Sequence, residues 1–68
     1  MRDEVHILVE VKSGVLKGDV AELFRKARPY EKVTGIEPKP LIIGGLIDSN
    51  AWEAARRLNA ELRPIIRA

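Results

Sequence analysis

Two charged side chains near the end of an apolar segment are the residues of this chain best suited to chemistry. Residues 5–12 read Val-His-Ile-Leu-Val-Glu-Val-Lys and are rich in β-branched side chains, which favours a strand. Because side chains alternate along a strand, Glu10 and Lys12 are predicted to share one face. We expect the valines and isoleucine of the other face, which are Val5, Ile7, Val9 and Val11, to be packed away from water.

This spacing suits metal-dependent hydrolysis. The Glu10 carboxylate is a hard oxygen ligand for Mg²⁺ or Mn²⁺, and the neighbouring backbone carbonyl of Val11 can add a second oxygen. Lys12 can orient or deprotonate a water, or neutralise charge on a phosphate. The predicted catalytic residues are therefore Glu10 and Lys12, and the predicted metal ligands are Glu10 and Val11. The alternative is an ordinary ion pair between Glu10 and Lys12 on one strand face, which stabilises a protein by about 0–1 kcal/mol.

Further elements follow at regular intervals. Asp19, with Glu22 three residues later, is typical of a helix start, and apolar residues then recur at helical spacing until Pro29 interrupts them. We expect Pro29 to kink the helix or to end it near Arg28. Gly35 is a plausible helix stop. Residues 41–47 form a continuous apolar run, which is typical of a strand covered on both faces, and its Gly44-Gly45 pair permits a close backbone approach.

A second helix and a last strand complete the pattern. Asp48 or Ser49 is expected to cap the helix, Asn59 to end it in a left-handed conformation, and residues 61–67 to form a strand. Pro64 cannot donate to a ladder, so that strand is predicted to lie at a sheet edge or to carry a bulge. The fold class is α/β, a β-α-β-α-β order with a mostly parallel three-stranded sheet in two or three layers, and residues 1–68 are one domain.

Size and composition narrow the possibilities. A chain of 68 residues has only a marginal core, and without cysteine neither a disulfide nor a thiolate metal site can stabilise it. We therefore expect a homo-oligomer that extends the sheet. The net charge of +2 is too small to indicate nucleic-acid binding by itself. Apolar runs are too short to span a bilayer, which favours a soluble cytoplasmic protein without a membrane partner.

The same elements resemble a known family. The segment from Ile7 to Gly14, the helix near Asp19, the strand 41–47 and the helix-strand tail are similar to the C-terminal half of the PD-(D/E)xK nuclease superfamily, and within it to small archaeal nuclease-like domains. The resemblance implies a restriction-endonuclease-like core and metal-dependent hydrolysis of a DNA phosphodiester. It also implies that Glu10 ligates Mg²⁺ or Mn²⁺ and that Lys12 assists the attacking water.

One part of the family pattern has no counterpart here. The family also places an Asp on a preceding strand, whereas the acids upstream of Glu10 are Asp3 and Glu4. Asp3 lies seven residues before Glu10, about 23 Å away along an extended strand, too far to share a metal within one subunit. Either a second subunit supplies the missing acid, or the chain is a truncated, non-catalytic fold fragment that acts in self-association or in docking to a partner.

Overall fold

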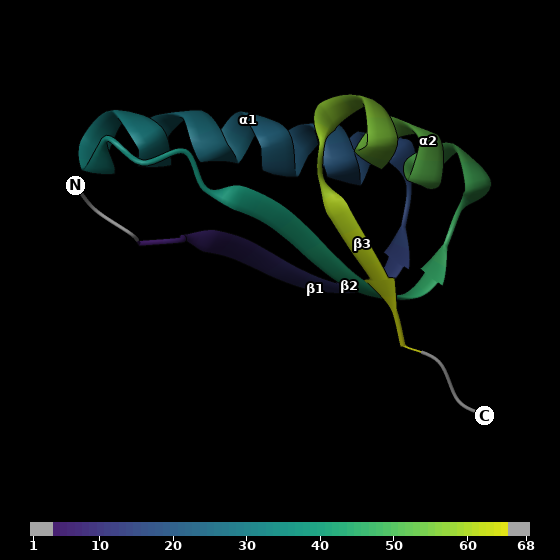
Figure 1. The fold of residues 1–68 in the computed structure, drawn as a ribbon. Helices are drawn as coiled ribbons and strands as arrows, with labels where there is room; N and C mark the ends of the chain where they lie inside the picture. The colour runs from purple at the N-terminus through teal and green to yellow at the C-terminus, as the bar shows by residue number, and fades with distance from the viewer. Residues whose placement is uncertain (1–3, 66–68) are drawn as a thin grey trace.

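The computed structural model describes residues 4–65, which form three strands and two helices in alternation (Figure 1). In chain order the elements are β1 (Ile7–Val15), α1 (Lys17–Thr34), β2 (Lys39–Ile47), α2 (Ser49–Leu58) and β3 (Glu61–Pro64). This order is the one predicted from the sequence. Within the described residues, no helix is long and apolar enough to cross a membrane.

The three strands form one parallel sheet in the order β1-β2-β3. Both crossover connections therefore run in the same direction across the sheet, which places α1 and α2 on the same face (Figure 1). The α/β class with a parallel three-stranded sheet is confirmed, and the architecture has two layers rather than three.

The core lies between the helices and the sheet. Ile42 on the central strand β2 is fully buried, and Val20 and Leu23 of α1 and Ala51 and Ala55 of α2 pack over the same side of the sheet. The α1 residues recur at i, i+3 and i+7, the spacing that keeps one helical stripe facing the sheet. This packing holds β1 and β2 beneath α1 in a fixed register. It thereby positions the side chains of β1 that lie on the helix-covered face of the sheet.

The opposite face of the sheet is open, which corrects two predictions. The odd-numbered side chains of β1 were expected to be packed away from water, yet Ile7, Val9 and Val11 are 54%, 51% and 66% exposed. Residues 41–47 were expected to be covered on both faces, but Leu41 and Ile43 are only half-buried. The physical reason is the topology: with both helices on one side, nothing in the described chain covers the other.

The N-terminal end of α1 differs from the prediction, whereas its C-terminal end matches it. The N-cap is Leu16, so Asp19 is the third residue inside the helix rather than its cap. Gly35 ends the helix with a φ of 74°, the left-handed conformation that glycine adopts without strain. Pro29 does not end the helix, because buried Ala27 before it and Tyr30, bonded to His6, after it hold both sides in place.

The glycine pair of β2 allows the close approach that the sequence predicts. A Cβ on Gly45 would lie 2.8 Å from the backbone oxygen of Ser13, and one on Gly44 would lie 2.5 Å from the Val15 side chain. Larger residues would separate β1 from β2 at this point.

The second half of the chain follows the predicted boundaries. Asp48 caps α2 by accepting a hydrogen bond from the Asn50 N–H, and Asn59 ends it with a φ of 58°. β3 is an edge strand, as Pro64 requires, and it covers Glu61–Pro64 of the predicted 61–67. Residues 66 and 67 lie outside the described part.

Candidate functional site

Lys12 is joined to the first turn of α1. The side chains of Leu8, Glu10 and Lys12 of β1 point toward the helices, and Lys12 Nζ lies 2.8 Å from Oδ1 of Asp19. The other oxygen of Asp19 accepts a hydrogen bond of 2.8 Å from the Leu16 N–H, one of the free donors at the helix start. One carboxylate thus fixes both the beginning of α1 and the position of the lysine.

The electrostatics follow from this contact. The hydrogen bond to Asp19, together with its negative charge, raises the pKa of Lys12, and the nearby carboxylates of Glu10 and Glu22 act in the same direction. Reciprocally, the hydrogen bonds from Lys12 and from the Leu16 N–H lower the pKa of Asp19. At neutral pH, Lys12 is therefore held as an ammonium beside an ionised carboxylate.

Glu10 shares the face of Lys12, as alternation predicts, but contacts a different helical residue. Its Oε1 lies 3.8 Å from Nζ of Lys26, about two turns further along α1 than Asp19. The structure therefore pairs each of the two β1 charges with α1. The ordinary ion pair between Glu10 and Lys12, which was the simplest alternative, is replaced by these two separate pairs.

The carbonyl of Val11 points to the outer side of the sheet. Backbone groups of successive strand residues point alternately to the two sides of the strand. The His6 carbonyl accepts a hydrogen bond of 2.8 Å from the Lys39 N–H, so it points toward β2. Because the register between β1 and β2 is unbroken from Ile7 to Lys12, the Val11 carbonyl, five residues beyond His6, points away from β2. It takes no part in that ladder.

The donor types present suit Mg²⁺ or Mn²⁺, but the set is incomplete. Glu10 and the Val11 carbonyl offer hard oxygen ligands, whereas such ions take six or more. Among residues 4–65 there is no group of three His, Asp or Glu side chains that could hold a metal. Asp3 lies outside this range. The described residues therefore do not make a full metal site by themselves.

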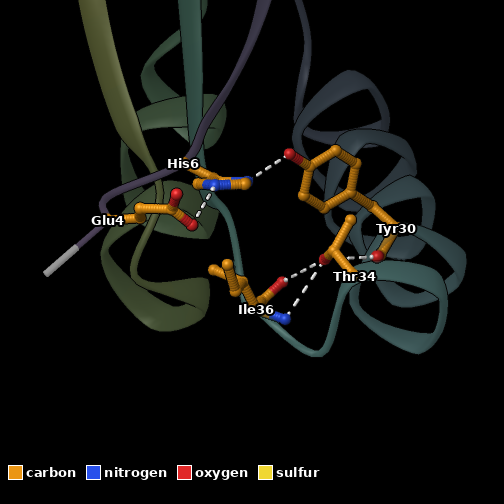
Figure 2. A network of polar contacts seen from close by, with 5 residues as sticks. All are labelled: Glu4, His6, Tyr30, Thr34 and Ile36. Carbon is orange, nitrogen blue, oxygen red and sulfur yellow. Dashed lines mark hydrogen bonds and ion pairs between the residues drawn. The ribbon is translucent and has the colours of Figure 1, made fainter. Parts of the chain in front are cut away.

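A second polar network joins the beginning of β1 to the end of α1 (Figure 2). His6 Nδ1 is hydrogen-bonded to the Tyr30 hydroxyl, and His6 Nε2 lies 3.6 Å from a carboxylate oxygen of Glu4. Thr34 continues the network by donating to the Tyr30 carbonyl at 2.8 Å and accepting from the Ile36 N–H at 3.1 Å. His6 is half-buried, and both of its ring nitrogens have a partner. It lies about 13 Å along the strand from Glu10, so the two side chains do not meet within one chain.

Asp19 is the residue of this region that sequence reasoning missed. It was interpreted as a helix cap only, without a role beside Lys12. The available signal is its place in the first helical turn directly after the strand that carries Lys12. A short connection of this kind returns the first turn of the helix over the end of its own strand.

Comparison with known proteins supports the resemblance drawn from the sequence. A family model described as the PD-(D/E)XK nuclease superfamily matches residues 1–61. No curated protein and no solved structure matches the chain. Since the family match extends over β1, α1, β2 and α2 to the first residue of β3, the chain belongs to the PD-(D/E)XK nuclease superfamily.

Proposed function

We propose that this nuclease-like domain carries part of a metal-dependent site for hydrolysis of a DNA phosphodiester. Nucleases of this superfamily generally use divalent metals. In this proposal Glu10 and the Val11 carbonyl supply oxygen ligands, and Lys12 faces the water or the phosphate. The observation that carries the proposal is the placement of Glu10 and Lys12 on one strand face, with the Val11 carbonyl free at the adjacent edge.

The role of Lys12 is narrowed by its partner. An ammonium has three N–H donors, and one of them is directed to Asp19. Two donors remain for a phosphate oxygen or a water. Because Asp19 favours the charged form, Lys12 acts as a hydrogen-bond donor and a positive charge rather than as a base.

A second candidate function rests on the incomplete ligand set. Two oxygens from Glu10 and Val11 bind a divalent ion weakly, and residues 4–65 hold no group of three acidic or histidine side chains around them. This favours, as the competing proposal, a non-catalytic nuclease-like domain whose role is self-association or docking to a partner.

A cleavage assay separates the two. The full chain is incubated with single-stranded, nicked and branched DNA in Mn²⁺, alongside Glu10→Gln and the matched surface variant Glu61→Gln. Glu61 is bound to Arg63 and Lys39 on the far edge of the sheet, so its loss tests for a general effect of removing an acid. The catalytic proposal expects cleavage that Glu10→Gln abolishes and Glu61→Gln retains. Equal cleavage by wild type and Glu10→Gln contradicts it, and absence of cleavage in all three supports the second candidate.

A further inference from the structure

Among residues 4–65, no strand pairs with the outer edge of β1. β1 is nine residues long and pairs only with β2 among the described strands (Figure 1). By the alternation that places the Val11 carbonyl, the backbone groups of Ile7 and Val9 also point away from β2. A long apolar edge strand is a template for pairing with another strand.

The sequence of this edge is complementary to itself when read in the opposite direction. If two copies of residues 4–12 lie antiparallel with Leu8 opposite Leu8, every charged side chain meets an opposite or hydrogen-bonding partner and every apolar one meets an apolar one. The five kinds of pair are Glu4 with Lys12, Val5 with Val11, His6 with Glu10, Ile7 with Val9, and Leu8 with itself.

We propose that two copies of this chain associate through antiparallel pairing of residues 4–12, the first part of β1 and the three residues before it, about a two-fold axis at Leu8. The directions of the backbone groups allow this register, because the outward-pointing N–H and C=O groups of Ile7 come to lie opposite those of the partner's Val9. The even-numbered residues then form the non-hydrogen-bonded pairs, in which side chains approach most closely.

Neighbouring registers lose the charge complementarity. Centring the pair on Glu10 places two carboxylates opposite each other, and like charges in that position are destabilising. Centring it on Val9 sets Glu10 against the partner's Leu8 and Lys12 against the partner's His6. Of these three registers, the one centred on Leu8 is the one that places both Glu10 and Lys12 of each copy opposite a complementary side chain.

The dimer joins the two sheets into one of six strands. A two-fold axis perpendicular to the sheet keeps α1 and α2 of both copies on the same face. α1 overlies β1 through the Lys12–Asp19 and Glu10–Lys26 contacts, so the two α1 helices lie antiparallel above the new pair of strands. The half-exposed Ile7 and Val9 side chains gain a neighbour from the second copy on the open face.

The pairing also supplies new groups to the candidate site. Glu10 comes to face the partner's His6, and Lys12 comes to face the partner's Glu4, with Cβ atoms about 4.5–5.5 Å apart. Carboxylate and imidazole are metal-ligand types, and among residues 4–65 of one chain no group of three such side chains could hold a metal. To bind a metal beside Glu10, the partner's His6 would exchange its own contacts with Tyr30 and Glu4. The Val11 carbonyl, which the pairing directs to the partner's Val5 N–H, would use its second lone pair. This consequence rests on the proposed function, whereas the pairing itself does not.

Cysteine substitution tests the register directly, because the chain has no cysteine of its own. Single variants Leu8→Cys, Val9→Cys and Glu10→Cys each place two thiols together only if the axis passes through that residue, since a disulfide needs Cα atoms about 4.4–6.8 Å apart. We expect mild oxidation of the folded full-length chain to cross-link Leu8→Cys fastest. Preferential cross-linking at Val9→Cys or Glu10→Cys, or at none of the three, overturns the proposed register.

Charge reversal tests the pairing without altering a core residue. We expect Glu4→Lys to raise the dimer dissociation constant about tenfold, because two symmetric Glu4–Lys12 pairs are lost at once. The matched variant Glu53→Lys, on the exposed side of α2, should leave the dissociation constant unchanged. Sedimentation at several concentrations supplies the measurement. A wild-type mass that stays at 7.6 kDa throughout, or an equal change in Glu4→Lys and Glu53→Lys, contradicts the proposal whatever the cleavage assay gives.

Discussion

Lys12 and Asp19 are joined across the space between β1 and α1 by a contact of 2.8 Å between Nζ and Oδ1. Asp19 also accepts from the Leu16 N–H, so the start of the helix and the position of the lysine depend on one carboxylate. Its side chain is 20% exposed and that of Lys12 is 34% exposed, which leaves both groups partly hydrated. The contact therefore orients Lys12 more than it stabilises the fold.

The first prediction concerns stability in acid. The pKa of Asp19 is lowered in the folded chain by Lys12 and by the Leu16 N–H, so its contribution to the free energy of unfolding is present above about pH 3.9, the ordinary value for Asp, and is lost as pH falls through the folded pKa. Asp19→Asn keeps a hydrogen-bond acceptor for Leu16 but removes the charge. We expect it to lower the free energy of unfolding at pH 7 by about 0.2–1 kcal/mol and to reduce the loss between pH 5 and pH 2.

Denaturant unfolding at several pH values measures this effect. Glu61 is a necessary control, because the hydrogen bond from Arg63 lowers its pKa as well, and it contributes to the same acid limb. The acid limb should therefore flatten in Asp19→Asn, and further when Glu61→Gln is added. An unchanged slope in Asp19→Asn would show that the contact with Lys12 does not persist in solution.

The second prediction concerns the lysine in the proposed reaction. If the chain cleaves DNA, Lys12→Met should lower kcat by roughly 10²–10³, the cost of removing one donor that stabilises developing charge. Lys39→Met is the matched control, since Lys39 also lies on a strand of the sheet and contacts a carboxylate, that of Glu61 at 3.7 Å. Rates under single-turnover conditions distinguish the two. Equal losses in both variants would mean that Lys12 acts only through overall charge.

Alternation along one strand is enough to predict that Glu10 and Lys12 share a face, because that property is local. It does not say which element covers the face. The helix begins at Lys17 with Leu16, a residue without a capping side chain, in the N-cap position, and this early start brings Asp19 to Lys12. Propensity favours a later start at Asp19 itself, so the pairing partner was not predictable from residue types.

The open face of the sheet shows a second limit. An apolar run such as 41–47 indicates a strand with little contact to water, but it does not distinguish a face covered by the same chain from a face that meets another. The coverage depends on the direction of the two crossovers, which is a property of the whole topology. Expectations for Gly35, Asp48 and Asn59 were reliable because each depends on the conformation of one residue.

The third prediction compares a glycine that has a close neighbour at the position of an added Cβ with a glycine that has none. Gly45→Ala should destabilise the fold by about 1–3 kcal/mol, since its Cβ would lie 2.8 Å from a backbone oxygen that a side-chain rotation cannot move. Gly18→Ala, in the first turn of α1 with nothing within 4 Å of the added atom, should be neutral or stabilising by up to about 1 kcal/mol. Thermal unfolding of both variants checks the difference. Equal stability would mean that β1 and β2 lie further apart near Ser13.

The last prediction tests whether the small core and the association of copies are linked. Leu23→Ala removes one of the largest fully buried side chains and should cost about 2–5 kcal/mol, a large share of the stability of so short a chain. Val33→Ala, also on α1 but 86% exposed, should change stability by less than about 0.5 kcal/mol. If pairing through β1 supports the fold, the unfolding midpoint of Leu23→Ala should rise with protein concentration, because association stabilises the folded state by mass action. Denaturation at a series of concentrations gives the result. A midpoint that is independent of concentration would show that each copy is stable by itself and that its core alone supplies the stability.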